Sequence, residues 1–216
     1  GGVGAATCVV RAGFGTERIT AGEDTVNYDG AVIDEGTMTA DTTLIFTGPE
    51  AGTLSDGTNT STFSEVELFA LGSGDDTVIG GAGNELVYAG AGNDTMTGGM
   101  GADTFYGGSG NDDITFSEGD NISGGSGDDI FTLEDLGEPT NGTITIDGGD
   151  GGETTDDGNP LTLEGDTLQL GTLADLSTLV KVSDGPNVDG NETFDGSVTM
   201  DDGTILKFRN IENIIC

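Results

Sequence analysis

Acidic side chains recur at a fixed interval in the middle of this 216-residue chain. From Leu71 to Thr132 the sequence divides into seven consecutive units, six of nine residues and one, FSEGDNIS, of eight. Carboxylates and backbone carbonyls are the hard oxygen ligands of Ca²⁺ and Mg²⁺, and calcium accepts the more irregular geometry. The chain therefore favours calcium as its cation, and an acidic residue, or Asn in one case, recurs at the sixth position of each unit. These residues are Asp76, Glu85, Asp94, Asp103, Asp112, Asn121 and Asp129.

The charge balance also requires cations. The chain has 40 Asp and Glu, 5 Lys and Arg and no His, which gives a formal net charge of −35. The absence of histidine excludes Ser-His-Asp catalysis and His-ligated zinc. Such a negative field argues against nucleic-acid partners, and no apolar run approaches the roughly 20 residues of a membrane span.

Glycine and apolar residues define the elements that position the acidic residues. The fourth position is always Gly, the second is Gly in six of the seven units, and the eighth is apolar in the six nine-residue units, with Ile122 as the matching apolar residue of the shorter unit. Paired glycines allow tight turns, and the three residues after each turn can form one short strand. We expect an all-β fold, a flattened parallel β-roll, with residues 1–70 and 133–216 as β-rich caps around the roll at 71–132.

Each unit would form half a coil, so alternate units would lie on the same edge of the roll. The first edge would carry Asp76, Asp94, Asp112 and Asp129. The second edge would carry Glu85, Asp103 and Asn121, together with the one-residue deletion. We expect the following glycines to shape the calcium-binding turns of the first edge: Gly72, Gly74, Gly90, Gly92, Gly108, Gly110, Gly125 and Gly127.

These units resemble the calcium-binding nonapeptide repeats of the RTX (repeats-in-toxin, hemolysin-type) proteins. The resemblance implies that ions lie between stacked turns, held by backbone carbonyls and sixth-position carboxylates. It implies about three strong calcium sites on the first edge and up to two weaker sites on the second. It also implies type I-like export and an extracellular location, secreted or at the cell surface. Because the apolar core is thin, we expect folding to require calcium.

The flanking segments carry weaker signals. Strands are expected at Thr43–Phe46 and Phe63–Leu71, a helix at Leu173–Leu179 and a hairpin at Val198–Phe208. Gly148, Gly149, Gly151 and Asp166 indicate one further turn with an additional calcium site. The ending RNIENIIC resembles the segment before Hint (hedgehog/intein) self-processing domains, which implies a processing junction between Ile215 and Cys216.

No catalytic motif is present in the sequence, so we expect a non-enzymatic, secreted calcium-binding structural or adhesive module. Two alternatives remain open: the calcium-dependent module of a larger secreted RTX enzyme, and a self-assembling filament or surface-layer subunit released by Hint processing. Self-association or an extracellular polysaccharide are the expected partners besides calcium. An outward row of Thr97, Thr115 and Thr132 and an outward pair, Tyr88 and Tyr106, are candidate contact surfaces.

Overall fold

The protein is built of β-strands. The computed structural model describes residues 7–9, 18–20, 32–34, 39–58, 60–64, 66, 68–134, 143–149, 165–171, 174–186, 192–200 and 203–215. These residues form twenty strands and no helix, so the expected all-β class is confirmed. Accordingly, the described residues include no helix that is long and apolar enough to cross a membrane.

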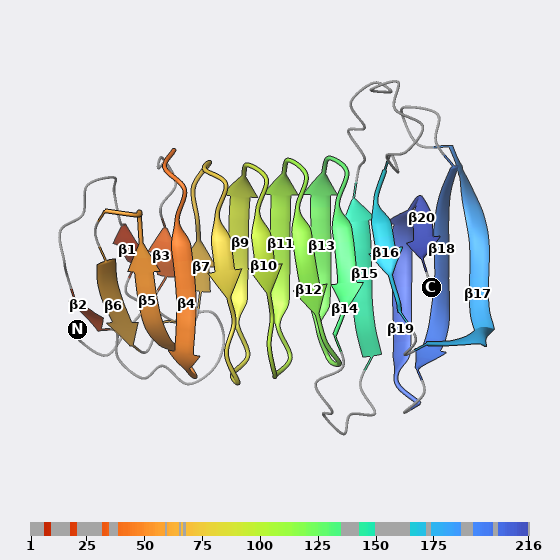
Figure 1. Ribbon diagram of the computed structural model, residues 1–216, viewed down its shortest axis with the longest axis horizontal. Helices are drawn as coiled ribbons and strands as arrows, with labels where there is room; N and C mark the ends of the chain where they lie inside the picture. The colour runs from red at the N-terminus through yellow and green to blue at the C-terminus, as the bar shows by residue number, and fades with distance from the viewer. Residues whose placement is uncertain are drawn as a thin grey trace.

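The strands form two ten-stranded sheets that face each other along the whole roll (Figure 1). In spatial order, one sheet contains β1 (Thr7–Val9), β3 (Val32–Asp34), β7 (Leu68–Ala70), β9 (Leu86–Ala91), β11 (Thr104–Ser109), β13 (Asn121–Ser126), β15 (Thr143–Gly149), β19 (Ile205–Ile211), β18 (Glu192–Met200) and β17 (Ala174–Pro186). The other contains β2 (Arg18–Thr20), β6 (Thr60–Ser64), β5 (Ala51–Ser55), β4 (Thr43–Gly48), β8 (Thr77–Ile79), β10 (Thr95–Thr97), β12 (Asp113–Phe116), β14 (Ile130–Leu133), β16 (Thr167–Gln169) and β20 (Asn213–Ile215).

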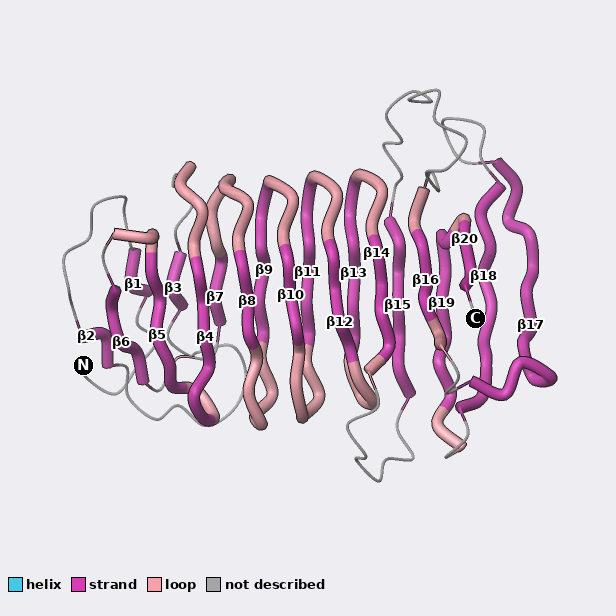
Figure 2. Tube along the Cα trace, in the orientation of Figure 1, coloured by secondary structure: helices cyan, strands magenta, loops and turns pink. Residues whose placement is uncertain are grey.

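The central strands wind as the expected parallel β-roll. The chain runs up a strand of one sheet, turns, runs down a strand of the other sheet, and turns again (Figure 2). Met96 pairs with Val78 before it and with Ile114 after it, a spacing of 18 residues or two units. The parallel pairing continues beyond the repeat units of residues 71–132: β15 pairs with β19, and β16 pairs with β20.

The core of the roll contains two facing ladders of inward side chains, one from each sheet. The apolar residue that recurs once in each unit is buried in all seven units: Val78, Val87, Met96, Phe105, Ile114, Ile122 and Phe131. Ile146 and Leu168 continue the ladders in the next coil, in register with Ile122 and Phe131. The roll is therefore only one side chain thick from each sheet, as its sequence period predicts.

Antiparallel strands flank the roll near both ends. At the N-terminal end, β4, β5 and β6 form a meander, and Phe46, Phe63 and Phe69 meet edge to face at centroid distances of 4.7–5.5 Å. At the C-terminal end, β18 and β19 pair antiparallel, which confirms the hairpin expected at Val198–Phe208.

The expected helix at Leu173–Leu179 is wrong. The segment from Ala174 onward is instead the long strand β17, which pairs antiparallel with β18. Pairing with an existing sheet and the β-branched Val180 and Val182 outweigh the weak local helix preference.

Candidate metal centre

Six carboxylates form a continuous row along the first edge of the roll, at the top of the view in Figure 1. In each coil, the backbone N–H of the row residue donates a hydrogen bond to the carboxylate of the next coil. The N–H of Asp94 donates to Asp112 Oδ1 over 2.8 Å, and that of Asp112 donates to Asp129 Oδ1 over 2.8 Å. The complete first row is Asp76, Asp94, Asp112, Asp129, Asp166 and Glu212.

The second oxygen of these carboxylates is what makes the row chemically unusual. Asp94, Asp112, Asp129 and Asp166 are each at most 1% exposed. Within the described part of the chain, their Oδ2 atoms accept no hydrogen bond. A buried charged oxygen without a partner is costly, and a bound cation is one way to satisfy it.

Glycine leaves space for such a cation beside three of the carboxylates. A Cβ atom added to Gly124 would collide with Asp129 Oδ2 and would lie 2.7 Å from the carbonyl oxygen of Gly148 in the next coil. Gly107 has the same relation to Asp112 Oδ2 and the carbonyl oxygen of Gly124. At each point a carboxylate and a backbone carbonyl therefore converge on a space that a methyl group would fill.

The first two coils lack this space. Gly107 is in register with Ala89, because the flanking residues pair across β9 and β11, and Leu71 precedes Asp76 as Ala89 precedes Asp94. Ala89 and Leu71 are both buried. Apolar side chains thus take the place of the glycine beside Asp76 and Asp94, so the sites along the first edge are not equivalent.

The second-position and fourth-position glycines have a different role, which is to let the turns stack. Gly108 and Gly110 adopt φ angles of +121° and +123°, a region that L-residues rarely enter. A Cβ on either would collide with a carbonyl oxygen of the preceding coil, from Gly90 or Gly92.

The second edge carries a shorter row, Glu85, Asp103 and Asp120. The N–H of Glu85 donates to Asp103 Oδ1, and that of Asp103 donates to Asp120 Oδ1, each over 2.8 Å. Asp103 Oδ2 and Asp120 Oδ2 both approach the open side of Gly98, where a Cβ would lie 2.7 and 3.2 Å from them.

The assignment of Asn121 to the sixth position is therefore wrong. Asn121 pairs with Thr104 on strand β13 and is exposed, while the buried Asp120 occupies the register of Asp103. The deletion shortens the turn before Asp120, and the N–H of Ser117 donates to Asp120 Oδ2 over 2.7 Å. The second edge keeps its charge at this coil, and its row ends one coil later at the buried Ile144.

Burial raises the carboxyl pKa values of both rows. Desolvation, with the neighbouring charges of Asp129 and Asp94, raises the pKa of Asp112 to about 8. Desolvation and the charge of Asp129 raise the pKa of Asp166 to about 9. On the second edge, desolvation and the charge of Asp120 raise the pKa of Asp103 to about 8. Without a cation, the ionised rows therefore oppose folding.

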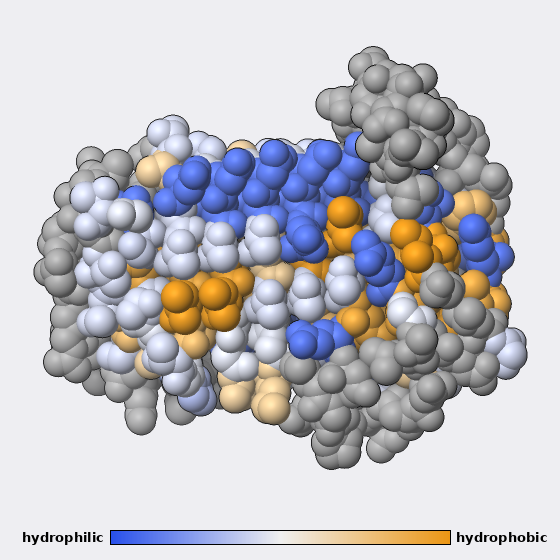
Figure 3. Space-filling view, in the orientation of Figure 1, coloured by the Kyte–Doolittle hydropathy of each residue, from blue (hydrophilic) through white to orange (hydrophobic). Residues whose placement is uncertain are grey.

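The residues present fit a hard divalent cation. Among the described residues, no point is approached by three acidic or cysteine side chains, so backbone carbonyls must complete any coordination shell. Carboxylate and carbonyl oxygens at successive turns supply the mixed oxygen set that calcium takes. A continuous hydrophilic band follows this edge of the roll (Figure 3).

Sequence reasoning missed Asp120 and Glu212 and placed Asp166 only as part of one further turn. A simple signal would have found all three. Every row carboxylate lies two residues before a core residue, because alternate strand residues point inward. Asp120 precedes Ile122, Asp166 precedes Leu168 and Glu212 precedes Ile214 by this interval. Gly151, expected in the same further turn, lies outside the described residues.

The proposed processing junction lies at the end of strand β20. Ile215 is the last residue of that strand, and its carbonyl accepts the N–H of Leu170 over 2.9 Å. Cys216 lies outside the described part of the chain.

Comparison with known proteins agrees with this geometry. The family model of the RTX calcium-binding nonapeptide repeat matches the chain in four copies. The matches cover residues 69–96, 79–114 and 117–135, and the first two ranges overlap. No curated protein matches the chain. The matched segments contain both rows from Asp76 to Asp129, and repeats of this family bind calcium. Residues 69–135 are therefore an RTX-type calcium-binding repeat region.

Proposed function

We propose that the chain is a secreted structural or adhesive module that folds when calcium binds outside the cell. The observation that carries this proposal is the pair of buried carboxylate rows, whose second oxygens accept no hydrogen bond at Asp94, Asp112, Asp129 and Asp103. Calcium ions between successive turns would neutralise these oxygens. The first edge would then hold ions between Asp76 and Asp94, Asp94 and Asp112, and Asp112 and Asp129. The ions beside Asp76 and Asp94 would bind more weakly, because the buried Leu71 and Ala89 take the place of the glycine there.

The second edge would hold up to two further ions. Asp103 and Asp120 present two carboxylate oxygens to one space beside Gly98. Glu85 is less favourable, because its longer side chain turns back and Oε2 accepts the N–H of Gly81 over 3.3 Å in its own turn. We therefore expect the ion between Glu85 and Asp103 to be the weaker of the two on this edge.

Calcium dependence is the basis for proposing an extracellular location. Calcium sites of extracellular modules have Kd values of about 10⁻⁴–10⁻³ M, so they stay empty in the cytosol and fill outside the cell. The chain would be exported unfolded and become rigid on release. We propose no catalytic role for it, because the buried carboxylates are accounted for as cation ligands.

A calcium titration followed by isothermal calorimetry tests this function. We expect several ions to bind, with a large heat of coupled folding, and magnesium at the same concentration to produce neither. Magnesium is the matched control because it prefers a strict octahedral shell that these stacked turns do not offer. Absence of calcium binding at millimolar concentration would reject the proposal.

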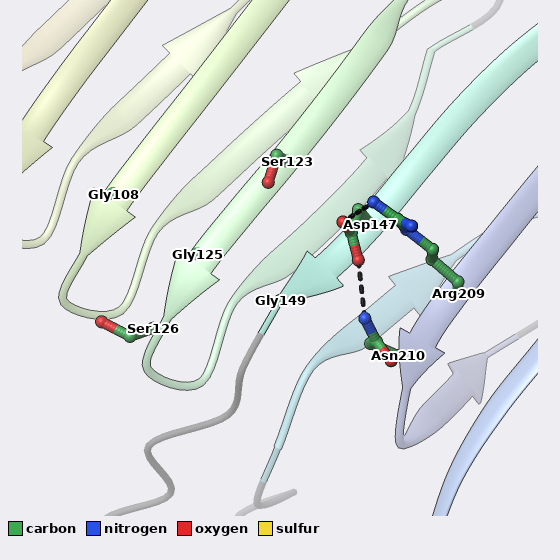
Figure 4. Close-up of a pocket in the computed structure, with 8 residues that line it drawn as sticks. All are labelled: Gly108, Ser123, Gly125, Ser126, Asp147, Gly149, Arg209 and Asn210. Carbon is green, nitrogen blue, oxygen red and sulfur yellow. Dashed lines mark hydrogen bonds and ion pairs between the residues drawn. The ribbon is translucent and has the colours of Figure 1, made fainter. Parts of the chain in front are cut away.

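A second candidate function is the binding of a neutral sugar on the outer face of the sheet that contains β11 and β13. Tyr88 and Tyr106 stack in parallel there, with ring centroids 4.5 Å apart and planes 6° apart. A hollow of about 540 Å³ lies nearby, lined by Ser123, Asp147 and Arg209 among others (Figure 4). Aromatic faces beside polar groups suit sugar rings, and the net charge of −35 disfavours anionic glycans. Binding to a neutral-glycan array that is lost in Tyr106→Ala would support this candidate, and no binding would reject it.

A further inference from the structure

The C-terminal end of the first row lies outside the RTX repeats and is built from three separate segments. Asp166 is 1% exposed, and its N–H donates to Glu212 Oε2 over 2.8 Å. The Asp166 carbonyl accepts the N–H of Glu212 over 3.2 Å and that of Asn213 over 2.9 Å. Gly165 makes room for this contact, because a Cβ there would lie 2.8 Å from Glu212 Cγ.

A space for a cation is present here as it is in the repeats. A Cβ added to Gly148 would collide with both Asp166 Oδ2 and the carbonyl oxygen of Asn210. Asp166 Oδ2 is buried and accepts no hydrogen bond. Asn210 thus supplies the carbonyl that Gly148 supplies one coil earlier and Gly124 two coils earlier.

The backbone of Asn210 is held in the conformation that places this carbonyl. Its φ angle of +52° lies in the left-handed region, which Asn tolerates better than most residues. Its N–H donates to Asp195 Oδ1 over 3.1 Å. Its Nδ2 donates to Asp147 Oδ1 over 2.8 Å (Figure 4). Two hydrogen bonds from neighbouring strands therefore keep the carbonyl beside Asp166.

We propose that a calcium ion binds between Asp166, the Asn210 carbonyl and Glu212, and that this ion fastens strand β20 to the end of the roll. The proposal rests on the proposed calcium-dependent function and extends it to residues outside the repeats. It would make the order of the chain's last strand depend directly on calcium.

Strand β20 has few other contacts to hold it. It has three residues and is the last strand of its sheet, and among the described strands it pairs with β16 alone. Its inward residue, Ile214, is only partly buried against the core. Glu212 lies immediately before it, so an ion shared by Glu212 and Asp166 would fix the strand at its first residue.

Glu212→Gln tests the proposal on the full chain. The glutamine oxygen can still accept the N–H of Asp166, but the ligand charge is lost. We would count bound ions by equilibrium dialysis at roughly 1 mM free calcium and follow amide hydrogen exchange in residues 213–215. The matched control is Glu134→Gln, which changes an exposed glutamate next to β14.

We expect Glu212→Gln to bind one ion fewer than the wild type and to exchange at least tenfold faster in β20. Asp166→Asn should show the same faster exchange, and Glu134→Gln should match the wild type. A full ion count in Glu212→Gln, with or without faster exchange, would overturn the proposal while leaving the repeat sites intact. A wild-type chain that binds no calcium would instead reject the proposed function itself.

Discussion

The backbone N–H of Asp112 donates a 2.8 Å hydrogen bond to Asp129 Oδ1, and Asp129 Oδ2 is left buried without a hydrogen-bond partner. One carboxylate therefore has two roles. Its first oxygen sets the register between coils, and its second oxygen is directed at the space beside Gly124. The two oxygens of Asp112 and of Asp166 have the same separate roles. One residue type can therefore both set the stacking of the coils and supply an oxygen ligand to a cation.

Replacing Asp112 should weaken calcium binding, while replacing its neighbour should not. Asp112→Asn removes one ligand charge from two successive sites, and calcium affinity depends on ligand charge count. We expect the calcium concentration at half-folding to rise by on the order of tenfold or more. Asp113→Asn is the control, because Asp113 is exposed on strand β12. Equal midpoints for the two variants in a circular dichroism titration would contradict the assigned roles.

Adding a methyl group beside Asp129 should abolish one calcium site without changing the charge of the protein. The methyl group of Gly124→Ala would collide with Asp129 Oδ2. We expect one ion fewer by equilibrium dialysis. Gly48→Ala is the control, since nothing lies within 4 Å of a Cβ at that position. If Gly124→Ala keeps the full number of ions, the space is not a cation site.

The register of the second edge predicts that substitutions at two adjacent residues affect calcium affinity differently. Asp120→Asn removes a buried row carboxylate and should lower calcium affinity on that edge. Asn121→Asp adds a carboxylate to an exposed strand position and should leave affinity unchanged. Tighter binding in Asn121→Asp, measured by calorimetry, would show that Asn121 occupies the ligand position after all.

Calcium affinity should fall as the pH falls. Burial raises the pKa of Asp129 to about 7, of Asp112 to about 8 and of Asp166 to about 9 in the metal-free fold. Protons therefore compete with calcium across this range. Because these values lie above the unfolded pKa of about 4, protonation stabilises the metal-free fold at low pH, and this contribution is lost as the pH rises through 7 to 9.

The measurement for this prediction is a calcium titration at pH 5, 7 and 9. We expect the half-saturating concentration to be highest at pH 5. In chelator, β-sheet content should be greater at pH 4 than at pH 8. Affinity that does not change with pH would mean that the row carboxylates do not bind the ion.

The repeat predicted much of this structure because its period and the pleat of the strands agree. Val78, Met96 and Phe131 are core residues for the same reason that they repeat at the eighth position. The position of Asp120 could not be predicted by counting forward from a glycine, because the deletion falls within the turn. The register is set by the inward strand residue, Ile122 in this coil, and not by the turn.

Other features depend on contacts between distant segments. Glu212 joins the first row 46 residues after Asp166, and no repeat precedes it. β17 is a strand because β18 offers it an edge to pair with. The inequality of the first-edge sites also required the structure, since only the close approach of Gly107 to Asp112 Oδ2 shows that the first position of each unit lies beside a row carboxylate.

Circular dichroism of the full chain in excess chelator, followed by addition of millimolar calcium, tests the central claim most directly. The thin core and the two buried carboxylate rows predict a largely disordered chain in chelator at pH 8 and a cooperative gain of β-sheet on adding calcium. A full β-sheet spectrum in chelator, unchanged by calcium, would contradict the claim that bound cations hold this roll together.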